Sequence, residues 1–349
     1  MKIFFSGCIA SSAMSGWQRF HALKDLGHQV IPFEQSDFLN RASLKRPLRF
    51  MLRRFYDQSV LDAFNRDILE ALVRSRPQVA WLEWPMVLSR ETLVEAARRL
   101  PGCWFVSFQD DNPFGSRAGE HERWRLFLEA IPQYHLHFVK RATDVCEFQR
   151  RGAKAVRRFM HGFYEPLFRP IPVESIPEVM RQDVSFVGSP LDHRVGVISE
   201  LLSRHRLPLR VYGDRWHRTS SYYRHRACFR SAAFGDDYVR VICGSRICLG
   251  FVSSSNLDEY SMRTFEVPAC KGFFLAERTP THQELFVEGK EAEFFSSADE
   301  CADKIRFYLE NETVRARVAG QGYRRCVDSG YNLHKRLAEA VDQIQALKT

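Results

Sequence analysis

The sequence lacks the cysteine patterns that hold metal ions or disulfide frameworks. Its nine cysteines are scattered singly, with no CxxC pair and no Cys/His spacing typical of zinc ligands. An odd number of separated cysteines in a chain of 349 residues fits reduced thiols in a cytoplasm. We therefore expect no bound metal, no disulfide framework and a cytoplasmic protein.

Long hydrophobic runs are also absent. No window of the sequence approaches the roughly 20 apolar residues of a membrane-spanning helix. We expect no signal peptide, because the opening residues MKIFFSGC run straight into a predicted strand without a long apolar region. The sequence has no low-complexity tract and no internal repeat. These absences predict a globular protein that is either soluble or peripheral at a membrane.

Negative charge is in deficit. The chain has 51 Lys and Arg against 42 Asp and Glu, which gives a net charge of +9. Such a balance favours acidic partners, namely nucleotide sugars or an anionic membrane and, less so, nucleic acid. The length suits two domains of roughly 150 to 180 residues each.

The amino-terminal half alternates short apolar runs with amphipathic segments, a pattern that predicts parallel strands separated by helices. The predicted strands are 2–8, 29–33, 78–84, 103–108, 134–139 and 156–161. Gly7 and Gly16 after the first strand do not spell GxGxxG, so a dinucleotide site is not favoured.

Two acids follow the predicted strand 103–108. Asp110 and Asp111 come at the carboxyl end of this strand, where open α/β sheets bind their ligands, so either could act as a catalytic base. Alternatively, Asp111 or Asn112 only begins a turn before Pro113.

The tract 41–55 is the most basic part of the chain. Its apolar residues recur at helical spacing, and six Lys and Arg residues surround this stripe. One interpretation is an interfacial helix on anionic lipid at the inner face of the membrane. The other is a helix packed on the core with a solvated basic face.

The stretch 248–277 organises the carboxyl-terminal half. An apolar run, 247–252, predicts a buried strand, and a polar loop follows it. Ser261 is then a candidate cap for a short helix that carries Arg263 and Glu266 and ends at Gly272. A helix N-terminus after a strand favours a phosphate, and the fork of an arginine suits a diphosphate. A carboxylate one turn further accepts hydrogen bonds from sugar hydroxyls.

These residues carry a resemblance to a known family. The pattern S-x-R-x-F-E-x-x-A-C-x-G at 261–272, followed by L-F-x-x-G-x-E-x-x-F at 285–294, resembles the group 1 glycosyltransferases, and most closely their CgeB-like branch. The resemblance covers most of the carboxyl-terminal half and extends to the other half by pattern only. Lys271 departs from it, since the family usually has a small residue there, and this departure puts the close packing of helix and strand in doubt.

The resemblance implies an α/β fold of the GT-B type, with two Rossmann-like domains facing each other across a cleft. Prolines at 170, 172 and 177 mark a linker (169–182) between an acceptor-side domain (1–168) and a nucleotide-sugar domain (183–332). We expect the final helix (333–349) to return to the first domain, as final helices do in this fold. Group 1 enzymes carry two acids eight positions apart, one towards the donor sugar and one towards the ribose. Asp258 and Glu266 match this spacing.

The implied activity is metal-independent transfer of a hexose-like sugar from a nucleotide-diphosphate sugar to a hydroxyl of a glycan, lipid-linked or protein acceptor in glycan or surface-polysaccharide synthesis. Arg263 would stabilise the departing diphosphate, and Asp110 or Asp111 would be the base. The expected donor-binding residues are Gly188, Ser189, Tyr212, Gly213, Asp258, Tyr260, Ser261, Met262, Arg263 and Glu266. The alternatives are a nucleotide-sugar epimerase or hydrolase of the same fold, and a non-catalytic protein that binds an anionic polymer or membrane.

Overall fold

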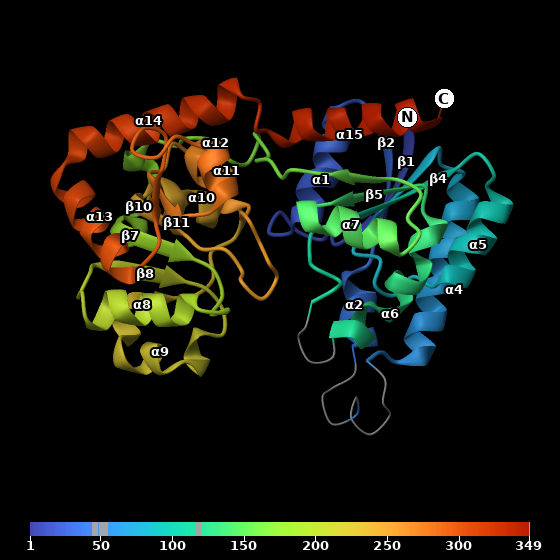
Figure 1. Cartoon of the computed structure of the whole chain (residues 1–349), viewed down its shortest axis with the longest axis horizontal. Helices are drawn as coiled ribbons and strands as arrows, with labels where there is room; N and C mark the ends of the chain where they lie inside the picture. The colour runs from blue at the N-terminus through green and yellow to red at the C-terminus, as the bar shows by residue number, and fades with distance from the viewer. Residues whose placement is uncertain (44–47, 49–54, 116–119, 349) are drawn as a thin grey trace. The chain divides into compact units, whose positions relative to one another are not determined.

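The computed structural model describes residues 1–43, 48, 55–115 and 120–348 (Figure 1). Packing divides the chain into two compact units. Unit 1 combines Met1–Met160 with Arg336–Thr349, and unit 2 is His161–Lys335. The chain therefore leaves unit 1, forms the whole of unit 2, and returns to unit 1 with its last helix.

Unit 1 contains a six-stranded sheet in the order β2-β1-β3-β4-β5-β6, with every neighbouring pair parallel. Its strands are β1 (Lys2–Gly7), β2 (Gln29–Glu34), β3 (Val79–Glu83), β4 (Trp104–Gln109), β5 (Leu136–Val139) and β6 (Val156–Arg158). Its helices are α1 (Ser15–Asp25), α2 (Ser36–Ala42), α4 (Gln58–Ser75), α5 (Arg90–Arg99), α6 (Glu120–Ala130), α7 (Ala142–Arg150) and, from Arg336 onwards, α15 (Leu333–Lys348).

Helices cover both faces of this sheet, because its central strands are apolar on both sides. On one face, Phe4 and Phe105 join a core with side chains of α4, α5, α6 and α7. On the other face, Phe5 packs on Phe20 of α1, with ring centroids 5.7 Å apart. The unit thus has the layered architecture that the alternating sequence pattern predicts.

Unit 2 contains a second six-stranded parallel sheet, in the order β12-β11-β10-β7-β8-β9. Its strands are β7 (Gln182–Val187), β8 (Leu209–Tyr212), β9 (Phe229–Arg230), β10 (Ser245–Gly250), β11 (Phe274–Glu277) and β12 (Glu293–Phe295). Its helices are α8 (Arg194–Ser203), α9 (Ser220–Arg224), α10 (Gly235–Cys243), α11 (Arg263–Ala269), α12 (Pro280–Leu285), α13 (Ala298–Glu310) and α14 (Glu312–Asp328).

The strand order of unit 2 reverses between β7 and β10. The chain runs outwards from β7 to β8 and β9, and β10 then pairs with the other side of β7 and leads to β11 and β12. Open α/β sheets bind ligands at such a reversal, outside the carboxyl ends of the strands. The carboxyl edge of the second sheet, between β7 and β10, is therefore the expected position of a ligand site.

The division by packing differs from the boundaries that we expected. The segment 169–182, expected to be a linker, packs on unit 2: Ile176 is buried, and the Gln182 N–H donates to the main-chain oxygen of Gly244 at 2.9 Å. The boundary between the two units along the chain consequently falls between Met160 and His161, not after residue 168. Most of the basic tract 41–55 lies outside the described residues, so its contacts stay a prediction.

Candidate functional site

The carboxyl ends of β7 and β10 position the side chains of the candidate site. β7 leads through Gly188 and Ser189 to α8, which begins at Arg194. β10 leads through the loop 251–262 to α11, which begins at Arg263. Because these two strands flank the strand-order reversal, two helix N-termini, each with an arginine, lie at the same edge of the sheet.

Arg263 lies across the end of β7. Its Nε donates to the main-chain oxygen of Val187 at 2.6 Å, and its guanidinium carbon is 5.6 Å from the centre of the Phe186 ring. Glycines permit this approach: a β-carbon at Gly188 would lie 2.8 Å from Arg263 Nη2, and one at Gly213 would lie 2.1 Å from the Gly188 oxygen. Both glycines that the sequence singled out therefore belong to the support of Arg263.

Arg194 is the site residue that sequence reasoning missed. It is 5% exposed, its Nη2 donates to the main-chain oxygen of Val252 at 3.3 Å, and its Nε has no hydrogen-bond partner in the described part of the chain. Burial and then the neighbouring charge of Arg263 lower the pKa of Arg194 to about 10. A buried cation with an unfilled donor next to a second cation is a place where an anion is stabilised.

Carboxylates brace the loop 251–262 around these cations. Asp192 accepts hydrogen bonds from the hydroxyls of Ser253, at 2.6 Å, and Ser255, at 2.5 Å. Asp258 accepts one from Asn256 Nδ2 at 3.0 Å. Asp192 thus ties the start of α8 to the loop after β10, so that the two arginine-bearing segments are held together.

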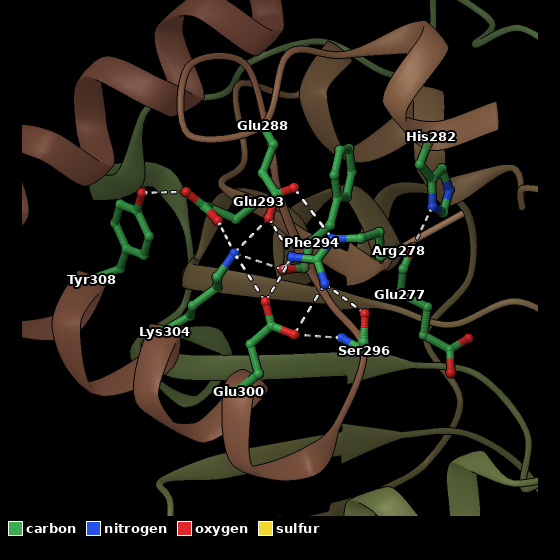
Figure 2. Close-up of polar contacts among 10 residues, drawn as sticks. All are labelled: Glu277, Arg278, His282, Glu288, Glu293, Phe294, Ser296, Glu300, Lys304 and Tyr308. Carbon is green, nitrogen blue, oxygen red and sulfur yellow. Dashed lines mark hydrogen bonds and ion pairs between the residues drawn. The ribbon is translucent and has the colours of Figure 1, made fainter. Parts of the chain in front are cut away.

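Glu277 at the end of β11 anchors the same loop. It accepts a hydrogen bond from the Val252 N–H at 2.7 Å and pairs with His193. The neighbouring side chain of Arg278 turns the other way, into a separate cluster of acids and Lys304 (Figure 2). The last residue of β11 and the residue that follows it therefore point to opposite sides of the sheet, as in an extended chain.

Glu266 lies in the first turn of α11 and is 5% exposed. The Tyr238 hydroxyl donates to its Oε2 at 3.0 Å. Burial raises the pKa of Glu266 to about 7, although the charge of Arg263 and the Tyr238 hydrogen bond pull it down. Near neutral pH this carboxyl can accept hydrogen bonds when ionised and donate one when protonated, and both roles suit sugar hydroxyls.

The start of α11 is not capped as we expected. Met262, not Ser261, precedes the helix, and it makes no capping hydrogen bond through its side chain. Instead, Ser261 N–H donates to Thr264 Oγ1 at 3.2 Å, and Thr264 Oγ1 lies 2.9 Å from His282 Nε2. His282 Nδ1 lies 2.6 Å from the Glu277 main-chain oxygen, which can only accept, so Nε2 accepts from Thr264. This chain of hydrogen bonds fixes the turn that bears Arg263.

Two expected binding residues turn inwards. Tyr260 is fully buried, and its hydroxyl accepts a hydrogen bond from the His161 N–H at 3.1 Å. Tyr212 is 6% exposed, and its hydroxyl donates to Gln182 Oε1 at 2.9 Å. The structure places both side chains inside unit 2, behind the strand ends, whereas Met262 remains partly exposed beside Arg263.

The close packing at Lys271 is preserved. Gly272, the next residue, approaches the helix so closely that a β-carbon there would lie 2.9 Å from Ile242 Cγ2 and 3.0 Å from Val267 Cγ1. Lys271 itself adopts a left-handed backbone with φ of 59°. Lys271 therefore does not prevent close packing, because Gly272 makes the close contact and Lys271 adopts the left-handed conformation that the turn requires.

In unit 1, Asp110 follows β4, and its carboxylate accepts a hydrogen bond from the indole of Trp84. Trp84 has a left-handed backbone with φ of 44°, an uncommon conformation for a bulky residue. Asp111 is partly exposed. Asn112 makes the following turn, since its Oδ1 accepts from the Phe114 N–H at 2.9 Å. Asp110 and Asp111 are thus at the carboxyl edge of the first sheet, as expected, and their role stays a prediction.

Within the described residue ranges, no group of three or more His, Cys, Asp or Glu side chains gathers closely enough to hold a metal ion. No helix found there has both the length and the apolar character required to cross a bilayer.

Solved structures of similar fold span the whole chain. Sucrose-phosphate synthase from Thermosynechococcus elongatus is 12% identical, with a TM-score of 0.67 over 99% of each chain. Anabaena HepE in complex with UDP-glucose is 11% identical, with a TM-score of 0.68 over 99% of this chain and 100% of that one. A UDP-forming trehalose-phosphate synthase from Burkholderia xenovorans is 13% identical, with a TM-score of 0.58 over 99% of each chain. These similarities confirm the predicted class of fold, GT-B, with two Rossmann-like units.

Sequence comparison adds a family match that covers most of unit 2 and the first residues of the segment that returns to unit 1. Residues 194–342 match the family described as glycosyl transferase-like, a range that begins at Arg194 and includes all of α11. No curated protein matches the sequence. The CgeB-like branch within the group 1 enzymes stays a prediction.

Proposed function

We propose that the protein is a glycosyltransferase whose unit 2 binds a nucleotide-diphosphate sugar. The observation that carries this proposal is the arginine pair at the strand-order reversal, with Arg194 buried beside Arg263 and short of acceptors. A diphosphate would supply those acceptors and offset the repulsion between the two cations. The family match of residues 194–342 and the UDP-glucose complex of HepE support the same class of ligand.

The two acids of the eight-residue spacing would contact hydroxyl groups of the donor. Glu266, whose pKa burial raises to about 7, lies one turn from the proposed diphosphate and would accept hydrogen bonds from the ribose. Asp258 in the loop would face the donor sugar. These assignments rest on the resemblance to group 1 enzymes and on the position of both acids at the carboxyl edge of unit 2.

The proposed reaction exchanges one bond at the anomeric carbon for another. The bond from this carbon to the phosphate oxygen breaks, and its electron pair stays on the diphosphate, where Arg194 and Arg263 stabilise the new charge. The oxygen of the acceptor hydroxyl forms the new bond, and its proton passes to Asp110 or Asp111 of unit 1. In this scheme fixed cations neutralise the leaving group, so the proposed transfer needs no metal ion.

The proposed setting is the cytoplasm, in glycan or surface-polysaccharide synthesis, with a hexose as the sugar and a glycan, lipid-linked or protein acceptor. All nine cysteines are free thiols, which supports a reducing compartment. Binding to the inner face of a membrane through 41–55 is a separate proposal. It predicts that changing Lys45, Arg46, Arg49 and Arg53 to Glu abolishes co-sedimentation with anionic vesicles.

The proposal is tested by calorimetry with a panel of nucleoside diphosphates, beginning with UDP. Arg263→Ala should weaken binding by roughly 1.5–3 kcal/mol, the range for a charge-assisted hydrogen bond, and should abolish transfer. Arg194→Met should weaken binding similarly, whereas Arg263→Lys should restore only part of it. Arg204→Ala is the matched control, because this arginine is 62% exposed at the other end of α8. Unchanged affinity in both the Arg263→Ala and Arg194→Met variants would place the diphosphate elsewhere.

Chelation separates the metal-free scheme from its rivals. Turnover of the donor should survive EDTA, and loss of turnover that magnesium or manganese restores would contradict the scheme. Release of nucleoside diphosphate without formation of a glycosylated product, with every acceptor offered, would instead favour a hydrolase of the same fold.

A further inference from the structure

A groove lined by cations lies at the opposite edge of unit 2. The side chains of Lys271, Arg317 and Arg324 line this groove of about 480 Å³, together with Ala316, Gly320 and Tyr323. We call it the α14 groove, because five of these six residues belong to that helix. Lys271 precedes β11 and so lies at the amino edge of the sheet, whereas Arg263 lies at the carboxyl edge. The α14 groove is therefore separate from the proposed donor site.

The spacing of the residues on α14 explains how the groove forms. Ala316, Gly320 and Tyr323 recur at intervals of four and three residues, so they share one face of the helix. The first two are small and leave a shallow floor, and a β-carbon at Gly320 would lie only 4.0 Å from Lys271 Cε. Helix α14 packs beside α11, which brings Lys271 to this floor (Figure 1).

The charge of the α14 groove has one sign. Its charged lining residues are all cations. In the described part of the chain, the side chains of Lys271, Arg317 and Arg324 form no hydrogen bond or ion pair. Elsewhere in unit 2, acids accompany the cations, as around Arg278 and Lys304. Arg324 also lines a neighbouring groove together with Glu291 and Asp328, whereas the charged side chains of the α14 groove itself are all positive and favour a bound polyanion.

Lys271 gives independent support. It follows the end of α11 with φ of 59°, a position at which glycine is the residue without steric penalty. A lysine there keeps a strained backbone, and strain of this kind concentrates at functional sites. The strained residue is also the one that brings a cation to the α14 groove.

We propose that the α14 groove binds a phosphate-bearing ligand. Arg317 and Arg324 offer planar forks that match phosphate oxygens, Lys271 adds a point charge, and the Tyr323 hydroxyl adds a donor. The volume of about 480 Å³ accommodates more than one phosphate group. The same chemistry is presented by a free polyphosphate and by the headgroup of an anionic phospholipid.

The test uses the full-length protein and two probes, tripolyphosphate in calorimetry and vesicles of phosphatidylglycerol in co-sedimentation. The groove variant carries Lys271→Asn, Arg317→Gln and Arg324→Gln. The control variant carries Arg218→Gln, Arg224→Gln and Arg226→Gln, which remove the same charge from another part of unit 2. A third protein, Arg263→Ala, reports on the proposed donor site.

The groove variant should lose at least tenfold in affinity for tripolyphosphate, while the control variant and Arg263→Ala keep at least one site of wild-type affinity. Binding of the wild type only to phosphatidylglycerol vesicles, lost in the groove variant and retained in the control, also supports the site and identifies a lipid headgroup as the source. Equal binding of the groove variant and the wild type to both probes overturns the proposal. So does a loss of tripolyphosphate binding in Arg263→Ala alone. Unchanged thermal unfolding of the groove variant shows that it is folded, and the single variant Lys271→Asn serves if it is not.

Discussion

Lys271 illustrates a conflict between stability and charge at a single residue. Its main-chain N–H donates to the Pro268 oxygen at 2.8 Å, and that of Gly272 donates to the Val267 oxygen at 3.0 Å, so two hydrogen bonds close the end of α11. This closure requires the left-handed backbone at Lys271, which costs a residue with a β-carbon about 1–2 kcal/mol.

Replacing Lys271 with glycine should therefore stabilise the protein. Glycine removes the steric cost but loses more backbone entropy on folding, so we expect a net gain of up to about 1 kcal/mol in the free energy of unfolding. Lys271→Ala is the matched control, since it removes the charge and keeps the β-carbon, and it should change stability by less than about 0.5 kcal/mol. Urea denaturation of the three proteins decides the point. A glycine variant less stable than the alanine variant would contradict the role of strain.

Glu266 predicts a dependence of stability on pH. Its pKa is about 7 in the folded protein against an ordinary value of 4.5, so the folded state holds this proton more tightly than the unfolded state. The associated stability is fully present below pH 4.5 and is lost as the pH rises to about 7. This difference in pKa corresponds to about 3 kcal/mol of stability.

Glu266→Gln should remove this dependence. The measurement is chemical denaturation without nucleotide. The free energy of unfolding of the variant minus that of the wild type should rise steadily between pH 5 and 7 and stay constant above pH 8. Tyr238→Phe provides the control: it removes the hydrogen bond that lowers the pKa of Glu266, so the loss of wild-type stability should extend to higher pH. Parallel curves for the wild type and Glu266→Gln would show that the carboxyl titrates normally.

The candidate site was predictable in part. Arg263 and Glu266 follow a predicted strand in a recognisable spacing, and the structure places both at the carboxyl edge of unit 2. Arg194 was not predictable, because it precedes Arg263 by 69 positions and reads as the solvated first residue of a helix. Only the three-dimensional structure shows that it is buried next to the second arginine. Tyr212 and Tyr260 were assigned to the surface because their position along the chain did not indicate the direction of their side chains.

Among the elements, β11, β12 and α13 are joined by a network of charges (Figure 2). Arg278 at the end of β11 donates to Glu288, at 2.6 Å, and to Glu300 of α13, at 2.6 Å. Lys304 of α13 donates to Glu288, at 2.7 Å, and to Glu293 of β12, at 2.5 Å. The hydrogen bonds from Arg278 hold the pKa of Glu300 at about 2. Since β12 is an edge strand, this network fixes the edge of the second sheet.

Arg278→Met should destabilise the protein by roughly 1–3 kcal/mol at neutral pH, between the values for exposed and buried ion pairs, because Arg278 is 26% exposed. The pKa of Glu300 lies below its ordinary value of 4.5, so its stabilisation is present above that pH and is lost as the pH falls towards 2. The two proteins should therefore converge in stability in acid. Arg306→Met is the control, since its pair with Asp303 is exposed, and it should cost less than about 1 kcal/mol. An equal cost at pH 7 and pH 2 would mean that packing, not charge, is lost.

The sequence predicted the elements better than their ends. The predicted strand 2–8 is β1 (Lys2–Gly7), and the predicted strand 103–108 is β4 (Trp104–Gln109), because buried strands leave strong patterns. The start of α11 was misjudged, since Ser261 has the composition of a cap but donates its N–H to Thr264. Helix α6 (Glu120–Ala130) was not predicted. It buries only a few side chains, among them Trp124 and Phe127, so its apolar signal is weak.

For the whole molecule, the division into two units predicts where a nucleotide acts. If unit 2 alone holds the diphosphate, UDP at 100 times its Kd should slow amide exchange of the core of unit 2 by about 100-fold, equivalent to about 2.7 kcal/mol. Peptides from 182–194 and 250–266 should show the first protection, and peptides of β1 and β3 should show none. Arg263→Ala at the same UDP concentration is the control, and its protection should fall below about 10-fold because its Kd is raised. Equal protection in both units would contradict binding by unit 2 alone.

At this scale, the fold was the most predictable property. The alternating pattern of strands and helices, together with the 261–272 pattern, indicated the GT-B class, which the solved structures confirm. The boundary was less predictable, because prolines at 170, 172 and 177 suggested a free linker. In the structure, that segment instead packs against the end of α10: a β-carbon at Gly244 would lie 2.4 Å from the Met180 oxygen.

The discontinuity of unit 1 has a consequence for synthesis on the ribosome. Unit 2 (His161–Lys335) is continuous in sequence and can fold as soon as it leaves the exit tunnel. Unit 1 cannot be completed until the final segment, Arg336–Thr349, has emerged, because the buried side chains Leu337, Val341 and Ile344 belong to its core. Unit 1 is therefore synthesised first but completed last, and a released chain that ends at Lys335 should contain a folded second unit beside an unfinished first one.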